Sequence, residues 1–433
     1  MAVNKVEVGG AVKLDLTQDT VTPETLLSGV TAHSAAGEQI TGTYAPPVSG
    51  EPGDITFYDY DGTIITSWSL EELASKAALP DLPSHAGLTC QGWNWSLTAL
   101  KSLNSKMNVG ANYITDDGKT RIYIHLEDGR LSPMLGCAPN GTVTVDWGDG
   151  TRPDTLTGTS ASTVIFTSSH HYATPGDYVI TLTVSGTCEI TGISSHSALL
   201  AHSETVSNLD IPYLSAIKKI ELGNSVDLGL LSFSGCGSLA EITIPLNSKM
   251  GYFLNCYSLR AYVMAPGSSF PQVSPFQNCS GLKIFVFAER STWDKINANA
   301  FRQCTALSEI KFPNEIQISG GSEFYGCRSL HSVCLKLYEF DLTIGAEAFY
   351  GCYSLASFKV LGPLEKIGSR AFYQCVGCGF YDFSECTAVP TLANANAFTS
   401  IPADCEIRVP ASLVSQWKAA TNWSTYADHI VGV

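Results

Sequence analysis

The fourteen cysteines of this 433-residue chain are the side chains best suited to chemistry, because thiols bind metals, form disulfides and act as nucleophiles. Seven of them recur with gaps of 20, 23, 25, 23, 25 and 23 residues: Cys236, Cys256, Cys279, Cys304, Cys327, Cys352 and Cys375. Such regular gaps indicate a structural repeat, so we expect buried free thiols that pack as small hydrophobic groups. A zinc site near Cys375, Cys378, Cys386 and Cys405 is the alternative, but their spacing is irregular and no histidine accompanies them.

Other residues that serve catalysis are present without the patterns that catalysis needs. The chain contains no G-x-S-x-G, H-E-x-x-H, Walker A or G-x-G-x-x-G motif. His196 and His202 lie in a serine-rich stretch, which we interpret as a polar loop between domains. A glycan hydrolase would need two facing carboxylates, which the sequence does not locate. We therefore expect no enzyme, no catalytic residue, no cofactor and no metal.

The cysteine repeat carries a longer pattern, Phe-x-x-Cys-x-x-Leu-x-x-Φ-x-Φ, in which Φ is apolar. Full matches begin at Phe233, Phe253, Phe276, Phe301, Phe324 and Phe349, and a degenerate one begins at Phe372. Phe and Cys three residues apart share one face of a short turn, and Φ-x-Φ alternates as a strand does. A single coil cannot bury its apolar stripe alone, whereas stacked coils can. The pattern therefore predicts a solenoid with a parallel sheet.

The period is typical of leucine-rich repeats. Residues 348–355, Ala-Phe-Tyr-Gly-Cys-Tyr-Ser-Leu, and residues 371–375, Ala-Phe-Tyr-Gln-Cys, resemble the coils of the BspA-like bacterial leucine-rich repeats. The resemblance covers residues 214–410, and residues 411–433 have the pattern of a C-terminal cap. That family occurs in surface, secreted and phage proteins, so the resemblance implies binding and not catalysis.

Two stripes on the predicted solenoid are candidate ligand sites. The residue after the repeat phenylalanine is Tyr325, Tyr350 and Tyr373 in three successive coils, and Tyr353 lies nearby. Such a ladder suits sugar rings or a protein partner, and simple stacking along the solenoid is the alternative. The second stripe consists of Val263, Ile284 and Val286, whose positions in the strands face outward. An exposed apolar patch marks an interface, unless a flanking loop covers it.

Residues 141–192 read as short strands around a tryptophan turn. Val-Asp-Trp-Gly-Asp-Gly-Thr at 145–151 and His-Tyr-Ala-Thr-Pro-Gly-Asp-Tyr at 171–178 resemble the PKD-type immunoglobulin-like domain, which implies a β-sandwich. In a sandwich the tryptophan belongs to the core and the aspartates fix turns. Calcium binding by Asp146 and Asp149 is the alternative, but no third acidic neighbour accompanies them.

Residues 54–140 predict a small α+β module. Asp-Gly turns at 61–62 and 117–118 indicate two hairpins, and Ser69 with Glu72 forms a capping box that opens a helix. Trp93 and Trp95 are interpreted as core residues, with sugar stacking as the alternative. Residues 45–53 are a Pro/Gly linker before this module, and residues 193–213 are a connecting loop after the sandwich.

Residues 1–44 are too few to fold robustly alone, which suggests attachment or oligomerisation. Leu-Asp-Leu-Thr at 14–17, Thr-Val-Thr-Pro-Glu at 20–24 and Ile-Thr-Gly at 40–42 resemble a segment of tail and appendage proteins from phages and prophages of Gram-positive hosts. The resemblance implies that this segment contacts other tail proteins. Many such appendages are homotrimers, so a homo-oligomer is an open alternative.

Composition agrees with a mostly β, multidomain binding protein. Charged residues make up only 15% of the chain, and 25 basic against 40 acidic residues give a net charge of −15. This charge argues against a nucleic-acid partner, and no apolar run is long enough for membrane insertion. The leading hypothesis is a virion-tail receptor-binding protein, made in the host cytoplasm, that recognises a bacterial cell-surface glycan or protein. A BspA-like adhesin on the bacterial cell surface is the alternative, and a tail-associated glycan hydrolase is a third hypothesis.

Overall fold

The computed structural model describes residues 53–129, 131–132, 135–159, 165–167, 170–186, 188–194, 216–223, 233–269, 274–289, 294–313, 315–337 and 342–433. It also describes the backbone of four short strands near the N-terminus. Strand β1 (Lys5–Val8) pairs antiparallel with β2 (Ala11–Asp15), and β3 (Thr31–His33) pairs antiparallel with β4 (Gln39–Thr41). The Thr-Val-Thr-Pro-Glu motif at 20–24, residues 45–52 of the predicted linker and most of the connecting loop lie outside the described residues.

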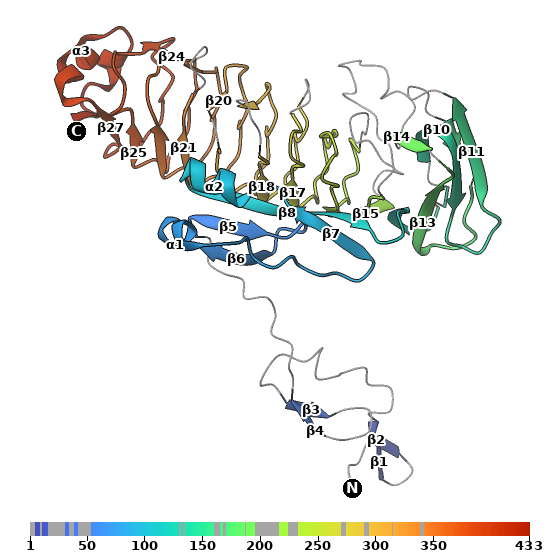
Figure 1. Ribbon diagram of the computed structural model, residues 1–433. Coiled ribbons are helices and arrows are strands. Elements are labelled where there is room, and N and C mark those ends of the chain that lie inside the picture. Colours follow the sequence, from blue (N-terminus) through green and yellow to red (C-terminus); the bar gives the residue numbers. More distant parts are fainter. Residues whose placement is uncertain are drawn as a thin grey trace.

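The second half of the chain is a solenoid, as predicted, and the described part of the protein is mostly β (Figure 1). Its coils contribute parallel strands to one side: β15 (Ile217–Glu221), β16 (Glu241–Ile242), β17 (Ala261–Val263), β18 (Ile284–Val286), β21 (Ser332–Leu335), β23 (Ser357–Val360), β25 (Phe380–Asp382) and β27 (Glu406–Val409). A second side carries shorter parallel strands: β19 (Asp294–Lys295), β20 (Ile316–Gln317), β22 (Thr343–Ile344), β24 (Lys366–Ile367) and β26 (Thr391–Leu392).

The repeat residues form a continuous spine inside the coils. The rings of Phe276, Phe301, Phe324 and Phe349 stack face to face, with centroids 5.2–5.7 Å apart. Each repeat cysteine from Cys256 to Cys375 donates its thiol hydrogen to the phenylalanine carbonyl of the preceding coil, as Cys304 does to Phe276 at 3.1 Å. The prediction of buried free thiols is confirmed for these cysteines. Burial raises the pKa of the Cys304 thiol well above its ordinary value, which keeps it protonated.

The C-terminal segment closes the end of the solenoid. It comprises η3 (Ala411–Leu413), α3 (Val414–Ala419), η4 (Trp423–Tyr426) and β28 (Ile430–Gly432), which pairs parallel with β27. Trp417 and Trp423 are fully buried, and Trp417 stacks on Phe383 with ring centroids 5.9 Å apart. These rings cover the last coil, which would otherwise present its apolar spine to water.

A four-stranded sheet with two short helices forms the predicted α+β module. The strand order is β6-β5-β8-β7, with β5 (Ile55–Tyr58), β6 (Ile64–Trp68), β7 (Leu88–Trp93) and β8 (Met107–Thr115). Helix α1 (Leu70–Ser75) begins with the predicted capping box, and α2 (Leu97–Leu103) follows β7. Trp93 and Trp95 are buried, at 8% and 2% exposure, so the core interpretation of this pair is confirmed.

The second predicted hairpin is wrong in its pairing. The turn at Asp117 and Gly118 forms, but β8 stays in the module while the next strand, β9 (Thr120–Leu126), joins another sheet. There β9 pairs antiparallel with β13 (Gly176–Val184) and also with β15, the first solenoid strand. Strands β10 (Leu135–Asp146), β11 (Asp154–Thr159), β12 (Ile165–Thr167) and β14 (Glu189–Ser194) complete this sheet. An alternating strand pattern does not say which edge it will pair with, so the sequence suggested the nearest partner.

Candidate binding surface

The apolar stripe predicted to be exposed is covered by another part of the chain. Val263 and Val286 are only 2% and 0% exposed, and with Tyr58 of β5 they form a small core against which Ile64 and Ile284 pack. The expectation of an open interface at Val263, Ile284 and Val286 is therefore wrong. Strand alternation predicted correctly that these side chains point away from the coil interior. They are buried by strand β5, which lies some 200 residues earlier in the chain, and not by a flanking loop.

Hydrogen bonds lock the module onto the solenoid. The side-chain amide of Asn94 donates to the carbonyl oxygens of Met264 and Phe287, at 3.0 and 3.1 Å. The indole Nε1 of Trp95 donates to the same Phe287 oxygen at 2.7 Å. The Asn112 amide donates to the Ile244 carbonyl at 2.9 Å. The covering sheet removes these solenoid carbonyls from water, and the module's side-chain donors replace the hydrogen bonds that water would have made.

The tyrosine ladder stacks in register. The rings of Tyr325 and Tyr350 lie 4.5 Å apart at an interplanar angle of 6°, and those of Tyr350 and Tyr373 lie 4.9 Å apart at 11°. All three are partly exposed, while Tyr353 beside them is 40% exposed. Because Tyr350 lies between two tyrosine rings and Tyr325 lies between Tyr350 and the Arg302 guanidinium, the ladder offers mainly ring edges and hydroxyl groups to a partner. The stacking along the solenoid that was the alternative is therefore present, and the binding of sugar rings or a protein partner by the ladder stays a prediction.

The backbone imposes this register. The residue that follows each ladder tyrosine has a left-handed backbone, with φ of 71° at Gly326, 68° at Gly351 and 61° at Gln374. The N–H of each of the two glycines donates to the backbone carbonyl of the ladder tyrosine in the next coil. Gly326 donates to Tyr350 at 2.7 Å, and Gly351 donates to Tyr373 at 2.8 Å. The two glycines adopt this conformation without strain.

Two arginines extend the ladder, and the sequence reasoning missed them. The Arg302 guanidinium lies 4.0 Å from the centroid of the Tyr325 ring, and that of Arg328 lies 5.6 Å from the Tyr353 ring. Arg302 follows Phe301 as each tyrosine follows its own phenylalanine, so the repeat alignment itself contained the signal. We call Arg302, Tyr325, Tyr350 and Tyr373 together with Arg328 and Tyr353 the Arg–Tyr ladder.

The outer face of the parallel sheet is covered over the early coils and open over the later ones. Its outward residues change accordingly from Thr243, Val263 and Val286, which are buried, to Cys334, which is exposed, and Lys359, which is partly exposed. Lys359 lies 3.5 Å from Asp382 and 3.3 Å from Glu385, so the charges on this open face are largely paired with one another.

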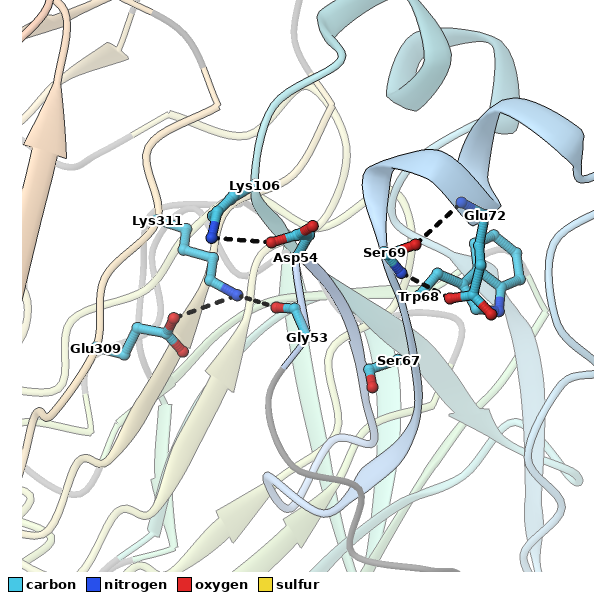
Figure 2. Close-up of a pocket in the computed structure, with 9 residues that line it drawn as sticks. All are labelled: Gly53, Asp54, Ser67, Trp68, Ser69, Glu72, Lys106, Glu309 and Lys311. Atoms are coloured by element: carbon cyan, nitrogen blue, oxygen red, sulfur yellow. Dashed lines mark hydrogen bonds and ion pairs between the residues drawn. The ribbon is translucent and has the colours of Figure 1, made fainter.

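An open cleft of about 380 Å³ lies where the module meets the solenoid (Figure 2). Asp54 pairs with Lys106 at 2.9 Å, and Lys311 lies 3.2 Å from Glu309 and donates to the Gly53 carbonyl at 2.9 Å. The hydrogen bond from Lys106, assisted by one from the Leu70 N–H, lowers the pKa of the Asp54 carboxyl. A glycosidase acid needs a raised pKa, so Asp54 is unsuited to that role. The cleft is a polar seam.

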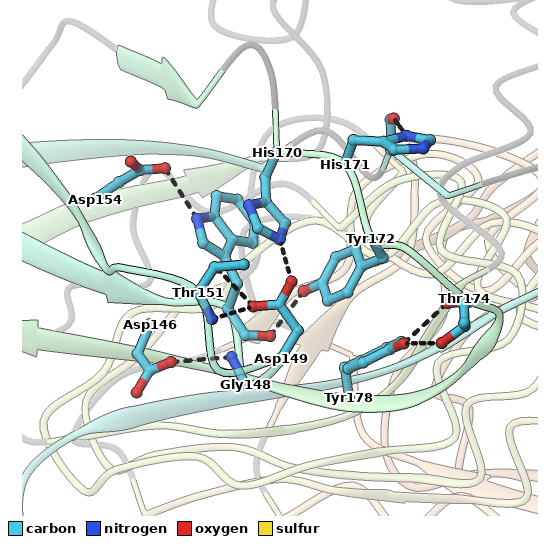
Figure 3. A network of polar contacts seen from close by, with 12 residues as sticks. Asp146, Gly148, Asp149, Thr151, Asp154, His170, His171, Tyr172, Thr174 and Tyr178 are labelled. Atoms are coloured by element: carbon cyan, nitrogen blue, oxygen red, sulfur yellow. Dashed lines mark hydrogen bonds and ion pairs between the residues drawn. The ribbon is translucent and has the colours of Figure 1, made fainter.

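The tryptophan turn forms a closed polar network (Figure 3). Trp147 is buried, its indole donates to Asp154 at 2.9 Å, and the His170 ring stacks on it with centroids 4.4 Å apart. Asp149 contacts His170 at 2.8 Å and accepts hydrogen bonds from Thr151. The core role of the tryptophan is confirmed. Asp149 is held within the turn, and the calcium alternative for Asp146 and Asp149 has no observation in its favour among the side chains described.

Comparison with known proteins identifies the repeat. Residues 212–283 and 272–400 match the BspA type leucine rich repeat region in 6 copies, so the chain contains BspA-type leucine-rich repeats. One solved structure that it resembles is a leucine-rich repeat protein from Bacteroides ovatus, with 22% identity and a TM-score of 0.31. That match covers 49% of this chain and 59% of that one. No curated protein matches the chain. The PKD-type and tail-segment resemblances stay predictions.

Proposed function

We propose that this protein is a non-enzymatic recognition protein whose solenoid binds a glycan or a protein on a bacterial cell surface. The observation that carries the proposal is the Arg–Tyr ladder, a row of partly exposed aromatic and guanidinium groups fixed by the coil backbone. Tyrosine and arginine are enriched among the residues that dominate binding energies. A ladder held by stacking and backbone hydrogen bonds also loses little side-chain entropy when a partner binds.

We further propose that the protein is an appendage of a phage or prophage tail. The support is the resemblance of residues 1–44 to tail-protein segments, which would join the recognition surface to a particle through contacts with other tail proteins. The BspA-type repeats agree equally with the alternative, an adhesin on the bacterial cell surface. None of the helices in the described ranges has the length and apolarity needed to span a membrane.

Binding of fluorescently labelled protein to a panel of Gram-positive cells tests the recognition role. The triple variant Tyr325→Ala, Tyr350→Ala, Tyr373→Ala should abolish labelling of strains that the parent protein labels. Phe380→Ala is the matched control, because Phe380 is a partly exposed aromatic residue on the open sheet face. Circular dichroism confirms that both variants fold. Undiminished labelling by the triple variant, or loss of labelling by the Phe380 control alone, would place recognition elsewhere.

The location of the protein separates the two proposals about its context. Antibodies against the solenoid should label the tails of particles released after prophage induction, in immunogold electron microscopy. Labelling of uninduced cell surfaces, with bare particles, would support the adhesin. Tail and holin genes beside the coding sequence would favour the tail protein, and an upstream secretion leader would favour the adhesin.

A further inference from the structure

The strip of surface that carries the Arg–Tyr ladder has a charge opposite in sign to the net charge of the whole chain. In the four coil turns at residues 299–305, 322–328, 347–353 and 370–376 the basic residues are Arg302, Arg328 and Arg370, against Glu323 and Glu347. Glu323 is fully buried, so it contributes no exposed carboxylate. The exposed part of the strip is therefore cationic on a chain whose net charge is −15.

Only one of these three guanidinium groups is neutralised nearby. Arg370 pairs with Glu347 at 2.6 Å. Arg302 and Arg328 lie over tyrosine rings, and no described carboxylate stands within ion-pair distance of either. Stacking on the ring orients a guanidinium while leaving its N–H groups free at its edge, and five donors in a fixed fork suit phosphate and carboxylate oxygens.

The tyrosines supply the second half of a recognition surface. Tyr325, Tyr350 and Tyr373 are partly exposed and stack nearly parallel with ring centroids 4.5–4.9 Å apart, so each ring contributes one hydroxyl group to a repeating row along the solenoid. Removal of water by stacking, reinforced by the adjacent tyrosines, raises the pKa of Tyr350, so this hydroxyl remains a hydrogen-bond donor. A row of evenly spaced donors favours a ligand that itself repeats, namely a polymer.

We propose that the Arg–Tyr ladder binds an anionic polysaccharide, with Arg302 and Arg328 pairing with its phosphate or carboxylate groups and the tyrosine hydroxyls donating to its sugar oxygens. The inference rests on the proposed function and narrows its ligand class. Since the rest of the chain is acidic, electrostatic repulsion elsewhere on the surface would oppose polyanion binding, which leaves the ladder as the place where a polyanion is tolerated.

Titration of the full chain with three probes tests the inference: polygalacturonate for carboxylates, inorganic polyphosphate for phosphates and dextran as a neutral polysaccharide. We expect binding to one or both polyanions, none to dextran, and a marked loss between 0.1 and 1 M NaCl, which shortens the screening length from about 10 Å to about 3 Å. Arg302→Gln with Arg328→Gln should weaken polyanion binding by at least about tenfold, because hydrogen bonds between charged partners are lost.

Arg152→Gln with Arg260→Gln is the matched control, because it removes the same charge elsewhere: Arg152 is exposed, and Arg260 pairs with Glu241 on the sheet. This control should retain the parent affinity. Equal binding of dextran, absence of binding to either polyanion at 0.1 M NaCl, or equal loss in both double variants would overturn the inference. The proposed function would survive these outcomes if the tyrosine triple variant still lost cell labelling, and the ladder would then bind a neutral glycan or a protein.

Discussion

At the scale of single residues, a glycine at the seam between the module and the solenoid has no room for a side chain. Gly110 on β8 faces Val263, and a Cβ atom added to it would lie 2.4 Å from Cγ1 and 2.8 Å from Cγ2 of that valine. Its backbone has no left-handed conformation, so the requirement for glycine is one of space alone. A substitution at Gly110 therefore tests how closely the two sheets pack.

We expect Gly110→Ala to lower the free energy of unfolding by about 1–3 kcal/mol, because the methyl group overpacks a closed interface. Chemical denaturation followed by circular dichroism measures this change. Gly379→Ala is the matched control, since a Cβ atom there meets its nearest neighbour, the Ala356 carbonyl oxygen, at an ordinary 3.5 Å. Equal stability of the two variants would mean that the module does not pack tightly on the solenoid.

At the scale of elements, the tryptophan turn between β10 and β11 is stabilised by a partly buried aspartate–histidine pair. Burial alone would raise the pKa of Asp149, but hydrogen bonds from the Thr151 hydroxyl and N–H and from His170 outweigh it and lower that pKa. The folded state therefore binds a proton at this carboxyl less readily than the unfolded chain. The resulting stabilisation is fully present above the ordinary aspartate pKa of about 3.9, and it is lost as the pH falls through the lower folded value.

Asp149→Asn should therefore cost about 1–2 kcal/mol of stability near neutral pH, because charge-assisted hydrogen bonds are replaced by neutral ones. The difference from the parent protein should shrink below about pH 4, where the parent aspartate also becomes neutral. Thermal unfolding between pH 3 and 7 measures both effects. Asp177→Asn is the control, because Asp177 also contacts a histidine, His125, at 2.7 Å but is 87% exposed. A pH-independent difference for Asp149→Asn would contradict the assigned cause.

The elements also show how far the sequence predicts the structure. The Phe-x-x-Cys period gave the coils, the buried thiols and the ladder register, because each follows from contacts between equivalent residues of neighbouring coils. The cover over Val263 and the partner of β9 did not follow, because both depend on contacts between unlike segments far apart in the chain. Arg302 stood in the repeat alignment, but only the fold shows that its guanidinium lies over Tyr325 and that none of the carboxylates described forms an ion pair with it.

At the scale of the whole molecule, the described domains share cores and sheets. Strand β9 joins the β10–β14 sheet to the first solenoid strand, and the module covers the sheet face of the early coils (Figure 1). The module, the β10–β14 sheet and the solenoid therefore pack into one continuous body through these contacts. These contacts hold the ladder in one orientation relative to the module, which a string of flexibly linked domains would not do.

Asn94 is the residue whose loss should uncouple this body. Its amide donates to two solenoid carbonyls and its Oδ1 accepts from the Gly110 N–H at 2.8 Å, all in a fully buried site. Asn94→Ala removes this partner from the Met264 carbonyl and the Gly110 N–H, while the Phe287 carbonyl keeps the Trp95 indole, so we expect a loss of about 2–3 kcal/mol in the free energy of unfolding. In hydrogen-exchange measurements on the parent protein, the amides of β5 and β8 should exchange at the same rate as those of β17 and β18. In the variant, the amides of β5 and β8 should exchange faster than those of β17 and β18. Asn247→Ala, at an exposed turn residue, should leave both rates unchanged. Separate exchange of the module already in the parent protein would show that the two parts fold independently, and the ladder would then be presented by the solenoid alone.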